Sequence, residues 1–175
     1  SALTAFCSID VGGMHFASDL SFGLDVPMDT AENVKRRYVF LQQPLSSTQI
    51  VRTHTGAKRV EHAAISLIID SRASELVSLI RAALREMGVS PEANPITYLT
   101  GGGMAMMKGA VNYLKANLQL PVKLDAPWVP DMDTPNYTSA FAALDFVLRA
   151  MDDAEAVDTQ SENRVVDKLR NLFIK

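Results

Sequence analysis

The sequence predicts an α/β fold with a mixed sheet and flanking helices. Three observations support this. Short apolar runs typical of strands alternate with amphipathic runs typical of helices, glycines and prolines separate the runs, and one helical pattern extends over about 60–87. Such alternation is typical of α/β proteins. With 175 residues, 47% of them hydrophobic and 21% charged, the chain is long enough for one domain or two small ones.

The first part of the chain is expected to form a strand followed by two helices. Residues 3–9 are an apolar run that ends at a Gly-Gly turn, which predicts the strand. Residues 14–24 carry apolar side chains every four positions, which predicts a short helix. Asp29 or Thr30 is expected to cap a second helix that extends to Tyr38. The pattern in the first helix consists of Phe16, Leu20 and Leu24.

The rest of the chain alternates strands with helices. Residues 46–60 combine a strand pattern with a turn at Gly56, and the long helical pattern behind them ends at Gly88. Its apolar positions recur at spacings of three and four. The remaining expected elements are a strand over 95–100, a helix over 104–118, a strand over 121–124 and a helix over 137–151.

Composition excludes several classes of function. The formal net charge is −3, which is too weak and of the wrong sign to indicate nucleic acid as a partner. The single cysteine, Cys7, rules out an internal disulfide and favours a reducing compartment. The three histidines are scattered without the spacing of metal ligands, so no metal site is predicted.

Three consecutive glycines, Gly101, Gly102 and Gly103, follow an apolar strand and precede a helical pattern. A phosphate loop of the Walker type needs Gly-Lys-Ser/Thr, but here Lys108 precedes Gly109, and the dinucleotide pattern G-x-G-x-x-G is broken at Met106. Two interpretations remain. One is a tight strand-to-helix turn, and the other is a backbone platform on which a flat ligand lies without interference from side chains.

Other stretches, taken in order, support the second interpretation. "VGGMHFASDLSFGL", "AENVKRRY", "IIDSRASELVSLI", "LTGGG", "PVKLDAP" and "PNYTSAFAALDFVL" together resemble the bacterial cell-division protein FtsA, a family of actin-like ATPases with a ribonuclease H-like fold. The resemblance covers about residues 9–148. It implies that residues 1–150 form an actin-like nucleotide-binding half, subdomain IIA, with subdomain IIB inserted at about 30–95.

The resemblance implies an ATP site. Gly101, Gly102 and Gly103 match the glycines that pack against adenine and ribose, and Glu32 and Lys35 match helix residues that approach the ribose and base from the other side. The turn at Gly12 and Gly13 belongs to the same site. Glu32 and Lys35 also lie three apart on one helical face, so both can reach one ligand, although the same spacing is equally typical of a surface ion pair.

The phosphate side of an actin-like site is not recognisable in this sequence. The family holds the β- and γ-phosphates with two glycine-rich hairpins, and neither is found here. Phosphoryl transfer also needs Mg²⁺ held by carboxylates, which the resemblance assigns to the complete protein alone. We therefore predict no catalytic residues, weak nucleotide binding at best and no ATP hydrolysis by this chain alone.

The end of the chain changes character. Residues 151–163 are acidic and contain no basic residue, which predicts a flexible linker. Residues 164–175 then read "RVVDKLRNLFIK", with an apolar face and a net charge of +3 from four basic residues and one acidic residue. Docking on this protein and binding to an anionic membrane both remain open. The apolar face comprises Val165, Val166, Leu169, Leu172 and Phe173, and the basic residues nearest to it are Arg164, Lys168 and Arg170.

The resemblance implies a division adaptor on the cytoplasmic face of the cell membrane. Such a protein is peripheral, forms polymers and receives the C-terminal tail of the tubulin-like protein FtsZ on subdomain IIB. Lys58, Arg59 and Arg72 are the candidate contacts for that tail, although such a cluster is also typical of a solvated face. The alternatives are an actin-like ATPase of a pilus-assembly or chaperone system, and an unrelated small α/β enzyme.

Overall fold

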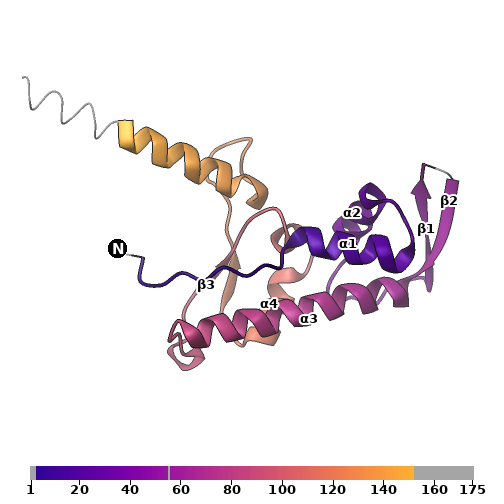
Figure 1. Cartoon of the computed structure of the whole chain (residues 1–175), viewed down its shortest axis with the longest axis horizontal. Helices are drawn as coiled ribbons and strands as arrows, with labels where there is room; N and C mark the ends of the chain where they lie inside the picture. Colours follow the sequence, from indigo (N-terminus) through magenta and orange to yellow (C-terminus); the bar gives the residue numbers. More distant parts are fainter. Residues whose placement is uncertain (1–2, 55, 152–175) are drawn as a thin grey trace, which may run out of the picture.

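Helices dominate the fold, and its strands are short. The computed structural model describes residues 3–54 and 56–151. Helix α3 is the longest element and runs along one side of the molecule, with α1 lying beside it (Figure 1). In chain order the elements are α1 (Gly13–Leu24), α2 (Met28–Arg37), β1 (Thr48–Thr53), β2 (Gly56–Glu61), α3 (His62–Glu86), η1 (Pro91–Ala93), β3 (Thr97–Leu99), η2 (Met104–Met106), α4 (Ala110–Leu118), β4 (Val122–Leu124), η3 (Pro135–Tyr137) and a last helix over residues 138–151.

The core lies where α1, α2 and α3 meet. Phe16 and Leu20 of α1 are fully buried, and so are Ile65 and Ile69 of α3. The four-residue spacing on each helix puts these side chains on one face, as the sequence predicts. Full burial of each such side chain contributes about 1.5–3 kcal/mol. The helices expected over 14–24 and over about 60–87 are thereby confirmed.

The strands form two separate sheets. β1 and β2 pair antiparallel, with Thr53 opposite Gly56, while β3 and β4 pair parallel through a crossover that contains α4. The α/β class is confirmed. Among the described residues, however, the expected mixed sheet is replaced by one antiparallel and one parallel pair. Each pair forms between strands that are close along the chain, and helices rather than further strands lie between the two pairs.

Two expectations near the N-terminus are wrong. Residues 3–9 are not a strand, and Leu3 and Phe6 are exposed, because no described strand offers them a hydrogen-bonding edge. Helix α2 does occur, but neither Asp29 nor Thr30 caps it. The helix begins directly after Pro27, so that Asp29 lies in the first turn, where its carboxylate accepts a hydrogen bond from the N–H of Thr30.

The helix expected over 104–118 is interrupted at Gly109. A 3₁₀ turn, η2, comes first and α4 starts only at Ala110, because Gly109 adopts φ +78°, a left-handed conformation that no α-helix interior permits. The turn lets the N–H of Phe40 donate to the carbonyl of Lys108 at 2.9 Å. The ring of Phe40 then packs against Tyr113 at 4.7 Å.

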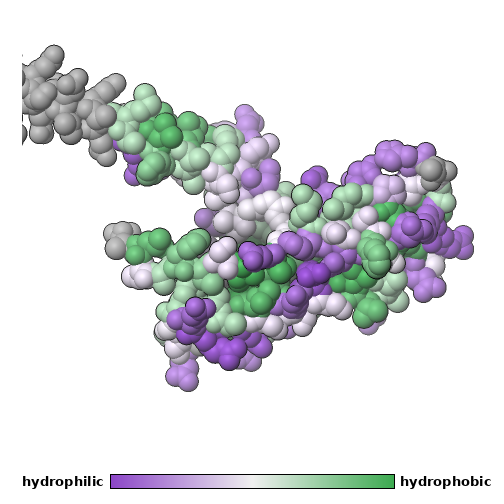
Figure 2. Space-filling view, in the orientation of Figure 1, coloured by the Kyte–Doolittle hydropathy of each residue, from purple (hydrophilic) through white to green (hydrophobic). Residues whose placement is uncertain are grey.

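The last helix projects from the body of the molecule (Figure 1). Its apolar side chains are largely exposed, among them Phe146 and Leu148, and Figure 2 shows the apolar surface that they form. The acidic linker and the amphipathic helix predicted beyond it lie outside the described residues.

Substitution of two glycines by alanine separates backbone strain from steric clash. Gly88 and Gly109 both have positive φ, but a Cβ at Gly88 meets open space, whereas one at Gly109 lies 2.7 Å from the carbonyl oxygen of Phe40. We expect Gly88→Ala to lower the free energy of unfolding by about 1–2 kcal/mol. Gly109→Ala should cost roughly 1–3 kcal/mol more, because the clash adds to the strain. Urea unfolding measures both, and equal losses would contradict the assigned contact.

Candidate nucleotide site and partner surface

The two glycine turns touch each other. Gly13 opens α1 and Gly103 precedes η2, and a Cβ built on Gly13 would lie 2.6 Å from the Cα of Gly103. Side chains larger than hydrogen are therefore excluded at Gly13. The structure thus brings together the two segments that the sequence assigned to one site, although about ninety positions separate them.

Lys35 of α2 holds the turn at Gly12 and Gly13 in place. Its Nζ donates to the carbonyl of Gly13 at 3.1 Å and pairs with Oε2 of Glu32 at 2.6 Å, and the side chain is only 4% exposed. Glu32 also accepts a hydrogen bond from Nε of Arg36 at 2.9 Å. The Glu32–Lys35 pair is therefore not an isolated surface ion pair, because its buried cation joins α2 to the backbone at Gly13.

The charge on Glu32 is stabilised by this arrangement. Partial burial acts to raise its pKa, but hydrogen bonds from Lys35 and Arg36 outweigh the burial, and the pKa lies below its ordinary value of 4.5. Glu32 is thus an anion at neutral pH. Its side chain remains 29% exposed, so an oxygen can still accept a hydrogen bond from a ligand.

The other glycines leave open space beside this contact. At Gly12 and at Gly101 a Cβ would meet nothing within 4 Å, and at Gly102 it would touch only Asn136 at an ordinary 3.6 Å. The N–H of Gly101 donates to the carbonyl of Pro135 at 3.0 Å, which fixes a φ of +93°. The residues present therefore fit a flat ligand such as adenosine. In the described ranges, no group of three His, Cys, Asp or Glu residues could hold a metal ion.

Two of the three predicted partner residues are engaged with carboxylates. Arg72 donates to both oxygens of Asp19 on α1, at 2.6 and 2.9 Å, and also to Glu75. Lys58 donates to the carboxylate of Asp25, just beyond α1, at 3.0 Å. Arg59 is the neighbour of Lys58 on β2 and lies on the opposite face of that strand. Arg72 and Lys58 thus fasten α1 to α3 and to β2, and Arg59 points elsewhere.

A hollow between α1 and α3 was not foreseen from the sequence. It encloses about 380 Å³ next to Arg72, and Phe22 and Leu67 at its sides are 92% and 70% exposed. Phe22 does not fit the four-residue apolar spacing of α1. This irregularity is the signal in the sequence that could have revealed the hollow.

Comparison of the fold places the chain among actin-like proteins. The crystal structure of MreB5 of Spiroplasma citri bound to ADP matches it with a TM-score of 0.59 and 19% identity, over 84% of this chain and 47% of that one. The family model of cell division protein FtsA matches residues 1–142. The chain therefore belongs to the FtsA family.

Individual relatives agree with this assignment. Cell division protein FtsA of Bacillus subtilis is 24% identical over 84% of this chain, and that of Helicobacter pylori strain 26695 is 31% identical over 68% of it. The aligned regions cover 34% and 26% of those two proteins, so the chain spans about a quarter to a third of such relatives. The predicted resemblance is confirmed, and the family match selects the division protein over the pilus-assembly and chaperone alternatives. No helix among the described residues is long and apolar enough to cross a membrane.

Replacing Glu32 by a neutral residue should make the free energy of unfolding depend less on pH in the acid range. Because its pKa is lowered on folding, Glu32 contributes stability above pH 4.5, and that contribution is lost as the pH falls through the folded-state pKa. We expect Glu32→Gln to reduce the free energy of unfolding at pH 7 by roughly 1 kcal/mol. The difference from wild type should shrink towards pH 3. The control is Glu92→Gln, an exposed carboxylate outside the site, and equal pH profiles for both variants would contradict this role.

Proposed function

We propose that this chain is part of a division adaptor that binds the adenosine moiety of ATP, self-associates and links FtsZ to the membrane at the division site. The contact between the two glycine turns, with Glu32 beside it, is the observation that carries the proposal. It supports a nucleotide platform in a chain of the FtsA family with an actin-like fold. The adaptor would be peripheral, on the cytoplasmic face.

Each residue of the platform has a distinct role in this proposal. Adenine and ribose lie against the backbone of Gly101, Gly102 and Gly12, where there is open space. Glu32 accepts hydrogen bonds from ribose hydroxyls. Lys35, which is buried, acts indirectly by fixing the carbonyl of Gly13. Bound ATP supplies a charged phosphate chain that the complete protein, with Mg²⁺, would hold.

Selective labelling of glycine tests the platform. The chain has nine glycines, so ¹⁵N-glycine gives a sparse spectrum in which weak binding is visible. We expect millimolar ATP to shift the amides of Gly12, Gly13 and the 101–103 run but not those of Gly56 and Gly88. Gly12→Ala should abolish the shifts without lowering stability, since its Cβ meets only open space and its extended backbone suits any residue. Shifts spread over all glycines, or none at all, would refute the site.

The hollow between α1 and α3 is the proposed seat of the FtsZ tail. Its apolar sides suit the apolar part of an acidic and apolar peptide, and Arg72 at its rim is still 22% exposed. The pKa of Arg72 is raised, chiefly by its hydrogen bonds to Asp19, so it remains a cation. Lys58 keeps α1 in position through Asp25, and Arg59, which is not in the lining of the hollow, has no part in this contact.

Phe22 provides the direct test of this seat. Because Phe22 is 92% exposed, Phe22→Ala should leave thermal stability unchanged, yet it should weaken binding of an FtsZ tail peptide by about tenfold. Phe6→Ala is the matched control, since Phe6 is 82% exposed and lies outside the hollow. If both variants bound the peptide as wild type does in fluorescence anisotropy, the tail would have to dock elsewhere.

Residues 164–175 are the proposed membrane anchor. Four basic side chains and the five apolar ones of the predicted helical face suit an anionic surface, at about 1 kcal/mol for each basic residue near it. Self-association would strengthen such weak anchoring, because many tails then bind together.

Vesicle co-sedimentation tests the anchor. We expect the full chain to sediment with phosphatidylglycerol vesicles and not with phosphatidylcholine vesicles, while a chain ending at Asn163 remains in solution with both. Equal sedimentation of the two chains would show that the last twelve residues do not anchor the protein.

A further inference from the structure

In the part of the chain that the structure describes, no strand pairs with the edge of β1 that faces away from β2. In an antiparallel pair the backbone groups of successive residues point alternately towards the partner strand and away from it. The carbonyl of Arg52 accepts a hydrogen bond from Oγ1 of Thr30, on α2, at 3.3 Å, so Arg52 faces away from β2. Ile50, two residues earlier, faces the same way. Among the described residues, no other element hydrogen-bonds to its N–H or C=O.

A groove runs along this edge. On one side are Thr30, Asn33, Val34 and Arg37 of α2, and on the other are four consecutive residues of β1, Gln49–Arg52; together they enclose about 360 Å³. Consecutive strand residues can all line one groove when the strand presents its edge to it. The side chain of Ile50 is 66% exposed there.

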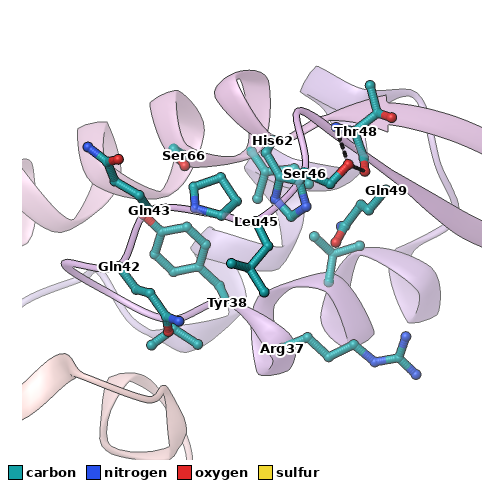
Figure 3. A pocket seen from close by; sticks show the side chains of 14 residues that line it. Arg37, Tyr38, Gln42, Gln43, Leu45, Ser46, Thr48, Gln49, His62 and Ser66 are labelled. Carbon is teal, nitrogen blue, oxygen red and sulfur yellow. Dashed lines mark hydrogen bonds between the residues drawn. The ribbon is translucent and has the colours of Figure 1, made fainter.

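A second cavity prolongs the groove beyond Arg37. It encloses about 440 Å³ between α2, the loop over 39–47 and the start of α3, and it shares Val34, Arg37 and Gln49 with the groove. Figure 3 shows its lining, in which hydroxyls and amides surround the rings of Tyr38 and His62 and Arg37 extends along one side. Because they share Val34, Arg37 and Gln49, the two cavities adjoin, and together they are called the trench.

The trench is cationic. Its described lining includes two guanidinium groups, those of Arg37 and Arg52, and no aspartate or glutamate. Two carboxylates on neighbouring residues are engaged: Asp29 binds Nε2 of His54 at 2.9 Å, and Asp70 accepts the hydroxyl of Tyr38 at 3.0 Å. Glu61 lies opposite Thr48, at the end of the second cavity that is farther from Arg52. An occupant with carboxylates would therefore meet the positive charge of Arg37 and Arg52 along the groove.

We propose that the trench receives an extended acidic peptide from a partner protein, which adds a strand to β1. Backbone hydrogen bonds to Ile50 would supply a part of the binding that does not depend on side chains, and Arg37 and Arg52 would select for glutamate or aspartate. This surface is separate from the glycine turns and from the hollow between α1 and α3. The proposal therefore stands or falls independently of the nucleotide and FtsZ assignments.

A synthetic peptide of eight alternating glutamates and valines, labelled with fluorescein, is the probe. We expect the full chain to bind it at least about tenfold more tightly than the same peptide with lysine in place of glutamate. N-methylation of every backbone nitrogen should abolish binding, since it removes the N–H donors from both edges of the peptide. The double variant Arg37→Glu/Arg52→Glu should lose the probe, whereas Lys123→Glu, an exposed charge reversal on β4, should keep it.

Amide hydrogen exchange locates the bound peptide. Binding should slow exchange at Ile50, whose N–H faces the groove, and leave Val51 unchanged, because Val51 already pairs with β2. Ile50→Pro should lose the probe but keep the rest of the amide spectrum, since proline is tolerated on an edge. Binding without protection at Ile50, equal binding of the lysine peptide, or protection of Ile50 already in the free chain would each overturn the proposal.

Discussion

The close approach of Gly13 and Gly103 is the constraint on which the rest of this structure depends. Two backbone turns can touch only where side chains are missing, and a buried cation, Lys35, keeps them together through the carbonyl of Gly13. The contact joins α1 and α2 to the segment that leads from β3 into α4. It leaves Gly12 and Gly101 facing open space beside an anionic Glu32. Open space beside the backbone thus follows directly from how the chain is held together.

Helix α1 links the glycine turns to the hollow beside α3 and to the β1–β2 hairpin. Its buried face, with Phe16 and Leu20, packs in the core, while ion pairs from Asp19 and from Asp25, just beyond its end, connect it to α3 and β2. Lys58 and Arg72, which the sequence suggested as binding groups, therefore also hold these elements together. What remains exposed beside them is apolar, and Phe22 is the clearest case.

The β1–β2 hairpin offers a different kind of surface from the hollow between α1 and α3. The hollow is defined by side chains, whereas the edge of β1 offers backbone groups beside two arginines. The chain spans a quarter to a third of the FtsA relatives described above, and yet it carries the two glycine turns, a hollow and an open strand edge that share no residues. The three proposed ligands would therefore not compete directly for the same residues.

The sequence by itself determined the class of fold, the long helix and the family, and it predicted that the two glycine turns lie together, because helical spacing and the order of motifs can be read along the chain. It misjudged residues 3–9 and the helix through Gly109, where the outcome depends on a partner edge and on contact with Phe40. Only the tertiary structure decided that Lys35 is buried and that Arg72 and Lys58 are paired. Only the tertiary structure also decided that the edge of β1 stays open, because all of these features depend on residues far apart in the chain.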